Sequence, residues 1–332
     1  MPENHSARRS EQSFAGGRHT LARLLSEYGI LLAFLVLVVV LSFASEYFLR
    51  ADNIINILRQ TSINALLAIG MTFVILTGGI DLSVGSVLAF GGIVAASLAS
   101  EAFGGGVVHP LVALAAGLGG GVLLGAINGL FIAKWRMPAF VVTLGMLSMG
   151  RGFTFIYSDG MPVPRIDERF LVIGQGTFLG IPFPVLILAF VFLVSWVILY
   201  KTRYGRYVYA VGGNEKSAQV SGVNTRWIIF SVYAISGFCA ALAGIILTAR
   251  TTAGLPQAGQ AYELDAIAAV VIGGTSLSGG RGTLTGTLIG ALLIGVIGNG
   301  LDLLGVSSYY QQVIKGAIII VAVLLDSFRK RD

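Results

Sequence analysis

The chain has 332 residues, of which 55% are hydrophobic and only 11% are charged, and its mean hydropathy is +0.84. Soluble globular domains carry about 25% charged residues, so this composition excludes an ordinary water-soluble enzyme, and its apolar content excludes a disordered chain. The net charge of +6 comes from basic residues that gather at the ends of apolar segments, which indicates membrane topology rather than nucleic-acid binding. With one cysteine and three scattered histidines, the sequence predicts no intrachain disulfide and no metal site.

Apolar segments of about 20 residues follow one another along the chain, and a segment of that length can cross a bilayer as a helix. They predict an all-α polytopic membrane protein with about ten transmembrane helices. The predicted spans cover residues 28–48, 61–79, 84–102, 110–133, 138–156, 184–200, 227–249, 263–278, 284–303 and 310–326. Residues 1–26 and 329–332 are expected to be tails, and residues 27–328 a single transmembrane domain.

The distribution of basic residues predicts which side each end of the helices faces. With both termini in the cytoplasm, 15 of the 22 Lys and Arg residues lie inside, six lie outside, and Lys315 falls within the last span. This excess satisfies the positive-inside rule. Two connections are much longer than the others, and a long ordered loop in a compact protein is often functional. Residues 157–183 form the expected outer loop and residues 201–226 the expected inner loop.

Two glycine-rich segments resemble each other. TGGIDLSVGS at residues 77–86 and IGGTSLSGGR at residues 272–281 agree at five of ten positions, and each leads into a glycine-rich helix. The similarity predicts a weak internal repeat with parallel copies at inner helix ends; chance likeness between Gly- and Ser-rich stretches is the alternative. Glycine-broken helices in the two halves of a transporter mark its pathway. The pathway candidates are therefore Gly78, Gly79, Asp81, Ser83, Gly85, Gly273, Gly274 and Ser278.

Several charged residues lie within or beside the predicted spans, where a charge is unfavourable unless it is paired or hydrogen-bonded. Asp81 is interpreted mainly as a cap for the helix that follows it, with direct substrate contact as the alternative. Glu263 and Asp265 are interpreted as charges that favour the start of the eighth span, at its outer mouth. Lys315 and Asp302 are candidates for an ion pair.

Glycines recur every four residues in two segments. They are Gly117, Gly121, Gly125 and Gly129 in the first, and Gly282, Gly286 and Gly290 in the second. In a helix such residues form one stripe, on which another helix can pack closely. The spacing predicts close helix packing, and a contact that slides during a conformational change is an additional hypothesis.

The sequence lacks the patterns of common catalytic and nucleotide-binding sites. It contains no G-x-x-x-x-G-K-[ST], no H-E-x-x-H and no G-x-S-x-G. We therefore expect no catalytic, cofactor-binding or metal-binding residues, no cofactor and no enzymatic activity. Any ATP that drives this protein must bind to another chain.

The long inner loop contains a short predicted helix. Asn214 can cap a helix from about Glu215 to Val220, and Gly222 can end it. Ala218 and Val220 would then form a small apolar face, which suits docking into a groove of a partner. A plain solvated loop is the alternative.

Four motifs in this order closely resemble the ribose-type permease family, the membrane subunits of bacterial ABC importers for simple sugars. They are GGIDLSVGS (78–86), AINGLFIAKWRMPAFVVTLGMLSMGRG (126–152), YGRYVYAVGGNEKSAQVSGV (204–223) and IGGTSLSGGRGTLTGTLIGALLIGVIGNGL (272–301). The resemblance covers residues 28–328. It implies that an ATPase docks on the inner loop, with the coupling role on Gly213, Asn214, Glu215, Ala218 and Gly222.

The resemblance also implies a function, a place in the cell and a set of partners. It describes a permease of the bacterial inner membrane that moves a simple sugar, by default ribose or a related monosaccharide. It implies a cytoplasmic ATPase with tandem nucleotide-binding domains, a periplasmic sugar-binding protein, and a second copy of this permease or a similar one. A gradient-driven secondary transporter and an ABC permease of the branched-chain amino acid type are the alternatives.

Overall fold

The computed structural model describes residues 29–102 and 107–329, and side chains as far as residue 324. The predicted tail at 1–26 and residues 330–332 of the other predicted tail lie outside the described residues. Within the described residues the chain is almost entirely helical. Its helices are Gly29–Ala44, α2 (Ala51–Leu76), α3 (Val84–Ala99), α4 (Pro110–Trp135), α5 (Ala139–Tyr157), α6 (Glu168–Gln175), α7 (Phe183–Lys201), α8 (Arg203–Gly213), α9 (Glu215–Val220), α10 (Thr225–Thr251), α11 (Tyr262–Ile272), α12 (Leu284–Leu303) and α13 (Ser308–Arg329).

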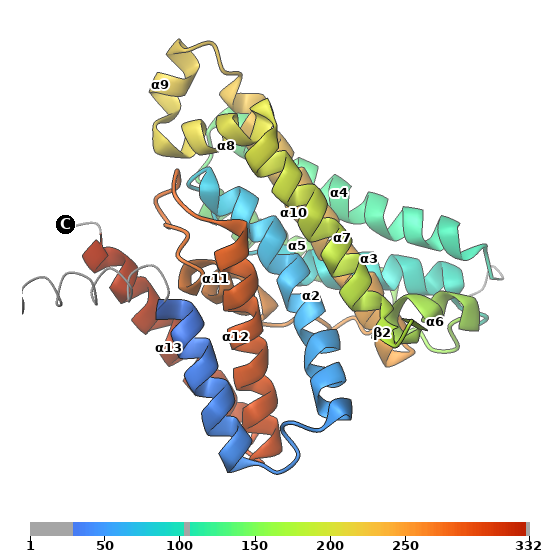
Figure 1. Cartoon of the computed structure of the whole chain (residues 1–332). Helices are drawn as coiled ribbons and strands as arrows, with labels where there is room; N and C mark the ends of the chain where they lie inside the picture. The colour runs from blue at the N-terminus through green and yellow to red at the C-terminus, as the bar shows by residue number, and fades with distance from the viewer. Residues whose placement is uncertain (1–28, 103–106, 330–332) are drawn as a thin grey trace, which may run out of the picture.

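Six of these helices are long and apolar enough to cross a membrane: α2, α4, α5, α7, α10 and α12. The helix Gly29–Ala44, α3 and the described part of α13 are apolar but shorter. The all-α polytopic architecture predicted from the sequence is therefore confirmed. Figure 1 shows the helices gathered in one bundle, with α8 and α9 at one end and the connections α6 and β2 at the other.

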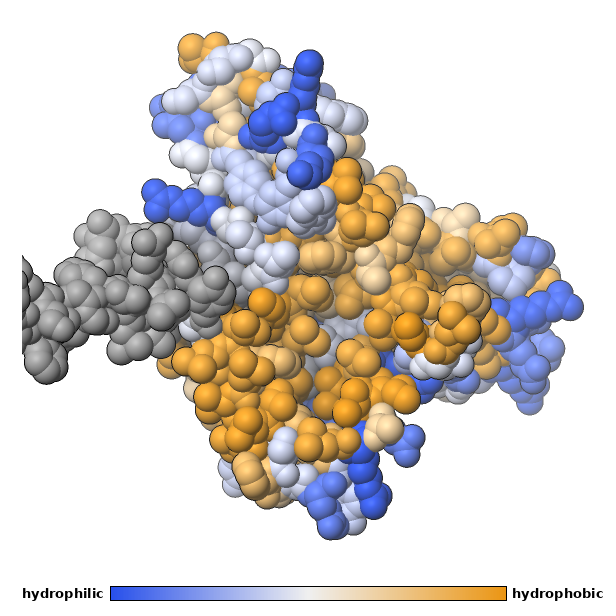
Figure 2. All heavy atoms as spheres, viewed as in Figure 1, coloured by the Kyte–Doolittle hydropathy of each residue, from blue (hydrophilic) through white to orange (hydrophobic). Residues whose placement is uncertain are grey.

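The centre of the bundle is formed by α2 and α10. α10 packs against α2, α3 and α4, while α12 packs against α2 and α11. Within the most apolar window of each helix, 83% of α2 and 67% of α10 is buried, against 22% of α5 and of α7. The outer helices thus turn apolar side chains away from the protein, as a helix in lipid must. Figure 2 shows hydrophobic residues across the middle of the viewed face and hydrophilic residues at its extremities.

Glycine allows the central helices to approach closely, as the four-residue spacing predicts. A Cβ on Gly121 would lie 2.6 Å from the Gly237 carbonyl oxygen, and one on Gly129 would lie 2.6 Å from the Phe230 carbonyl oxygen, both on α10. The second stripe brings Gly290 of α12 against α11. Gly282 is the exception, because α12 begins only at Leu284.

Two predicted spans differ from the helices observed. α2 begins at Ala51, ten residues before the predicted start at 61. α11 has only 11 residues, or about 16 Å at 1.5 Å per residue, which is too short to cross a hydrocarbon core of about 30 Å. The predicted span 263–278 is wrong as a complete span because Gly274 adopts φ +85° and ends the helix.

Glu263 and Asp265 lie in the first turn of α11, as the sequence predicts. A Cβ on Gly85 would lie 2.5 Å from a carboxylate oxygen of Glu263, so α11 starts beside the first turn of α3. Asp265 is buried and forms an ion pair of 2.8 Å with Lys315 of α13. Asp302 instead accepts a hydrogen bond from the Gln311 side chain, so the suggested pair with Lys315 is wrong.

The two long connections are structured. Residues 157–183 contain α6 and a short antiparallel hairpin, β1 (Thr177–Phe178) and β2 (Ile181–Pro182). The Gln175 side chain donates to the Ala249 carbonyl oxygen, which ties α6 to the end of α10. Residues 201–226 contain α8 and α9, which project beyond the bundle (Figure 1).

Candidate functional site

The break between α2 and α3 depends on glycine. Gly78 has φ +80°, a conformation that L side chains rarely adopt, and it ends α2. A Cβ on Gly79 would overlap the hydroxyl of Tyr233, and one on Gly85 would overlap the Gly259 carbonyl oxygen. The chain can therefore turn between tightly packed helices at this point only because these residues have no side chain.

Asp81 lies in this break and is buried, with 1% of its surface exposed. One carboxylate oxygen accepts from the Ser83 amide at 3.0 Å and from the Ser83 hydroxyl at 2.6 Å. The other accepts from the Ser236 hydroxyl of α10 at 2.8 Å. Asn128 of α4 donates in turn to the Ser83 hydroxyl at 2.9 Å. These contacts favour a structural role over substrate contact, because both carboxylate oxygens have donors. The amide bonded to Asp81 belongs to Ser83, the residue before α3, so Asp81 does not cap an amide of the helix itself.

The second glycine-rich segment contains the same backbone turn. In each segment a glycine with positive φ, Gly78 or Gly274, donates to the carbonyl three residues before it at 2.9 Å. The residue that follows each glycine donates to the carbonyl five residues before it at 3.1 Å. The backbone turns therefore match when Gly78 is aligned with Gly274. The sequence match instead aligns Gly78 with Gly273, so the two alignments differ by one residue.

The structure brings the two breaks into contact. The Gly280 amide donates to the Leu76 carbonyl oxygen at 2.9 Å, and a Cβ on Gly78 would meet the Ser278 carbonyl oxygen at 3.5 Å. Gly273 packs against the backbone of Gly286 in α12. Gly78 and Ser278 thus meet in one cluster with the ends of α2, α11 and α12. Asp81 and Ser83 instead contact α10 and α4, and Gly85 packs against Gly259.

The helix predicted from Asn214 and Gly222 is confirmed. α9 covers Glu215–Val220, the Asn214 side chain accepts from the Ser217 amide at 2.9 Å, and Gly222 has φ +84°. Ala218 is buried, but Val220 is 90% exposed, so the two residues do not share one apolar face as expected. Gly213, the last residue of α8, has open space where a Cβ would lie, but its backbone packs against Gly280. It joins α8 to α9.

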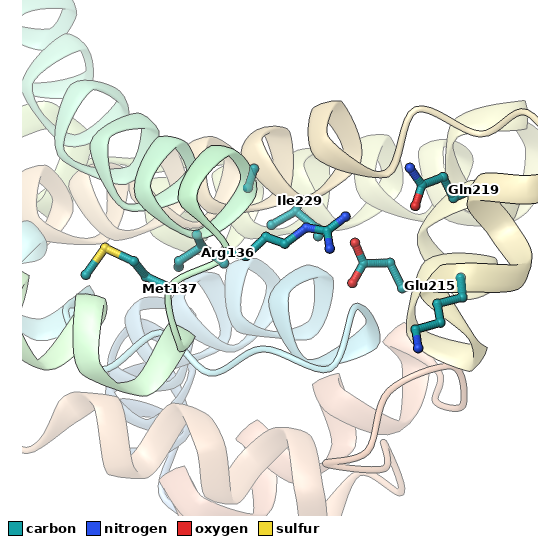
Figure 3. Close-up of a pocket in the computed structure, with 8 residues that line it drawn as sticks. Arg136, Met137, Glu215, Gln219 and Ile229 are labelled. Carbon is teal, nitrogen blue, oxygen red and sulfur yellow. The ribbon is translucent and has the colours of Figure 1, made fainter.

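A pocket of about 350 Å³ separates α9 from the bundle. Its lining residues are Ile132, Ala133, Arg136, Met137, Glu215, Lys216, Gln219 and Ile229. In Figure 3 the Arg136 guanidinium points from the end of α4 toward the Glu215 carboxylate of α9. Glu215 also accepts a hydrogen bond from the Thr225 hydroxyl at 3.3 Å, so it faces both the pocket and the start of α10. The pocket thus leaves one side of α9 apart from the bundle, while Ala218 packs into the core.

Some residues of the cluster have no signal in the local sequence. A Cβ on Gly212 of α8 would overlap the Leu76 carbonyl oxygen. The Tyr209 hydroxyl donates to the Gly282 carbonyl oxygen at 2.9 Å, and the Tyr200 hydroxyl accepts from the Leu284 amide at 2.9 Å. These pairs are 70 or more residues apart in the sequence, so only the tertiary structure identifies them.

The described residues contain no group of His, Cys, Asp or Glu side chains that could hold a metal ion. Beside the cluster, Tyr204 of α8 donates to or accepts from the Ser231 hydroxyl at 2.7 Å. Burial raises the pKa of the Tyr204 phenol, which keeps it neutral. The described cluster consists of packed helices, backbone turns and hydrogen bonds between them.

Comparison with known proteins defines the class. Residues 53–323 match the family described as the permease component of the branched-chain amino acid transport system. The chain belongs to this family of ABC transporter permeases and is a multi-pass membrane subunit of a bacterial importer. As a permease component it is a transport subunit without catalytic activity.

Several individual permeases are similar to this chain over almost their whole length. The chain is 50% identical to the ribose import permease RbsC of Escherichia coli K12, over 95% of this chain and 98% of that protein. It is 48% identical to the ribose import permease RbsC of Bacillus subtilis 168, over 91% of this chain and 93% of that protein. The D-allose transport system permease AlsC of Escherichia coli K12 is 42% identical over 90% of this chain and 91% of its own length. No solved structure matches.

Proposed function

We propose that this protein is the membrane subunit of an importer for ribose, with D-allose and other monosaccharides as the nearest alternative substrates. The observation that carries the proposal is the 50% identity to a ribose import permease over almost the whole of both chains. Identity falls to 42% for the D-allose permease and 37% for the L-arabinose permease of Azospirillum brasilense. Family membership also favours an ATP-driven permease over a gradient-driven secondary transporter.

The end of the bundle that carries α8 and α9 faces the cytoplasm in this proposal, as do both termini. Its support is the distribution of Lys and Arg, which are in excess in cytoplasmic loops. All three tryptophans, Trp135, Trp196 and Trp227, lie in helices at that end. Lys134 lies over the ring of Trp135 and Lys201 over that of Trp196, at 5.1 and 5.2 Å. Tryptophan is enriched at both membrane interfaces, so these rings mark an interface, and the basic residues indicate that it is the cytoplasmic one.

An ATPase subunit with tandem nucleotide-binding domains docks on α9 in this proposal. The coupling residues are Gly213, Asn214, Glu215, Ala218 and Gly222. The projection of α9, the exposure of Val220 and the pocket behind α9 support this assignment. A short capped helix that projects at the end of a bundle can enter a groove of a partner.

The opposite end, with α6 and the β1–β2 hairpin, receives a periplasmic sugar-binding protein. A second copy of the permease, or a similar chain, completes the channel. The glycine-rich breaks at 77–86 and 272–281 are the proposed pathway elements, and their common backbone turn supports descent from an internal repeat. When ATP binding moves α9, the helices around the breaks rock and open the path to the other side.

Uptake by reconstituted proteoliposomes tests this function. Vesicles would contain the permease with or without the ATPase, and the binding protein would be supplied or omitted on the outside. Radiolabelled ribose would be compared with allose, arabinose and xylose. We expect ribose uptake that requires ATP, the ATPase and the binding protein. Uptake by the permease alone, driven by an ion gradient, would refute the proposal.

A further inference from the structure

Three backbone segments meet at one point at the α8–α9 end of the bundle. The last turn of α2 supplies the Leu76 carbonyl oxygen, the connection between α11 and α12 supplies the Gly280 amide, and these groups form a hydrogen bond of 2.9 Å. Gly212, near the end of α8, lies against both. A Cβ at Gly212 would overlap the Leu76 carbonyl oxygen and lie 2.6 Å from the Gly280 nitrogen. Thus α8 touches the end of α2 and the α11–α12 connection in a single contact that has no room for a side chain.

Glycine is required on the other side of this contact as well. Gly279 and Gly280 have φ +82° and +71°. A Cβ on Gly280 would lie 2.7 Å from the Gly213 Cα, and one on Gly279 would lie 3.0 Å from the Gly212 Cα. The α11–α12 connection and α8 therefore pack backbone against backbone. Close-packed atoms resist compression, so a displacement of one segment must displace the other.

Two tyrosines hold the same connection from the side. The Tyr209 hydroxyl of α8 donates to the Gly282 carbonyl oxygen at 2.9 Å. The Tyr200 hydroxyl, at the end of α7, accepts from the Leu284 amide, the first residue of α12, at 2.9 Å. Burial, together with the nearby Tyr200 hydroxyl, raises the pKa of Tyr209, so its phenol remains a hydrogen-bond donor at any physiological pH. The start of α12 is thus fastened to both α7 and α8.

We propose that Tyr209 and Gly212 are positioning residues that transmit the movement of α9 to the two breaks, α2–α3 and α11–α12. The inference rests on the proposed function, in which an ATPase moves α9. Both residues lie on α8, which connects to α9 through Gly213, and both contact the α11–α12 connection directly. When α8 moves away from the α11–α12 connection, the Tyr209 hydrogen bond pulls the connection with it. When α8 moves toward the connection, the backbone contact at Gly212 pushes it.

The test measures coupling rather than activity alone. The complete complex, with permease, ATPase and binding protein, would be reconstituted, and ribose uptake and ATP hydrolysis would be measured in the same vesicles. Tyr209→Phe keeps the ring and removes only the hydroxyl. We expect it to lower the number of ribose molecules moved per ATP by about fivefold, the effect of losing one hydrogen bond. Gly212→Ala separates α8 from Leu76 and is expected to lower this ratio further.

Tyr207→Phe is the matched control, because Tyr207 lies on the same helix, is 40% exposed and has no hydrogen-bond partner among the described residues. It should leave the ratio unchanged. If Tyr209→Phe lowers uptake and hydrolysis equally, so that the ratio stays constant, its role is structural and the inference is refuted. If Gly212→Ala fails to assemble, Tyr209→Phe still decides the question. Absence of uptake by the unmodified complex would instead refute the proposed function itself, and this inference with it.

Discussion

Asp81 illustrates how a membrane protein can keep a carboxylate in its interior. Its oxygens accept from the Ser83 amide and hydroxyl and from the Ser236 hydroxyl, so both oxygens of the buried group have hydrogen-bond donors. The same bonds fix the start of α3 against α10. The sequence identifies Asp81 by its charge, and the structure shows that Asp81 links the start of α3 to α10.

Replacing Asp81 with alanine tests that role. The change leaves one amide and two hydroxyls without their acceptor, and we expect the free energy of unfolding to fall by about 2–3 kcal/mol. Ser236→Ala removes one of the three donors and should lower it by about 1 kcal/mol. Unfolding in mixed micelles, followed by tryptophan fluorescence, would measure both. Equal stability of Asp81→Ala and the unmodified protein would contradict this structural role.

The ion pair of Lys315 and Asp265 makes a second prediction at this scale. Asp265 is buried, so Lys315→Met leaves it without its cation, and breaking a fully buried pair on one side costs about 3–5 kcal/mol. Because the Lys315 side chain is 31% exposed, we expect a smaller fall in the unfolding free energy than that range. Asp302→Asn is the control, because Asp302 is exposed and accepts only from a neutral amide. If Asp302→Asn lowered the unfolding free energy as much as Lys315→Met does, burial of Asp265 would not explain the effect of Lys315→Met.

At the scale of the element, the glycine stripe on α4 can be tested with two neighbouring positions. A Cβ on Gly121 would meet α10, whereas one on Gly119 would meet nothing within 4 Å. Alanine favours a helix over glycine by about 1 kcal/mol at either site. Gly119→Ala should therefore be neutral or stabilising, while Gly121→Ala should lower stability and the yield of folded protein. The thermal midpoint in detergent measures the difference, and a stabilising Gly121→Ala would contradict close packing.

The cap of α9 gives another test at this scale. Losing an Asn cap costs about 1 kcal/mol, so Asn214→Ala should speed hydrogen exchange of the amides in residues 215–220 by about fivefold. Asn214→Asp retains a side-chain acceptor and should restore the original rate. Unchanged exchange in Asn214→Ala would mean that packing of the buried Ala218, rather than the cap, holds the helix.

α9 and α11 show when the sequence predicts where a helix begins and ends, and when it does not. Asn214 and Gly222 are local signals, and they define α9 to within the observed bounds. Residues 263–278 look like a span because their apolar character continues past Ile272. The helix stops there because Gly274 takes a left-handed conformation that hydropathy does not encode. Likewise the start of α2 at Ala51 is polar, so an apolar window misses it.

At the scale of the molecule, the candidate site combines segments far apart in the sequence. The motifs at 77–86 and 272–281 are visible as patterns, but the sequence does not predict that they touch. The bond from Gly280 to Leu76 and the packing of Gly212 against both depend on how α2, α8 and α12 fold together. Backbone contacts of this kind carry no side-chain signature beyond the presence of glycine, and this chain has 45 glycines.

The orientation of the bundle is the prediction on which the docking of both partners depends. Val220, on α9, is 90% exposed and Leu179, in the β1–β2 hairpin at the other end, is 86% exposed. The native Cys239 is buried, so a cysteine introduced at either position would be the main target of a membrane-impermeant maleimide. In right-side-out spheroplasts we expect Leu179→Cys to be labelled and Val220→Cys to be protected, and in inside-out vesicles the reverse. Labelling of Val220→Cys from outside would put α9 in the periplasm, where no ATPase could reach it, and would exchange the docking faces proposed for the two partners.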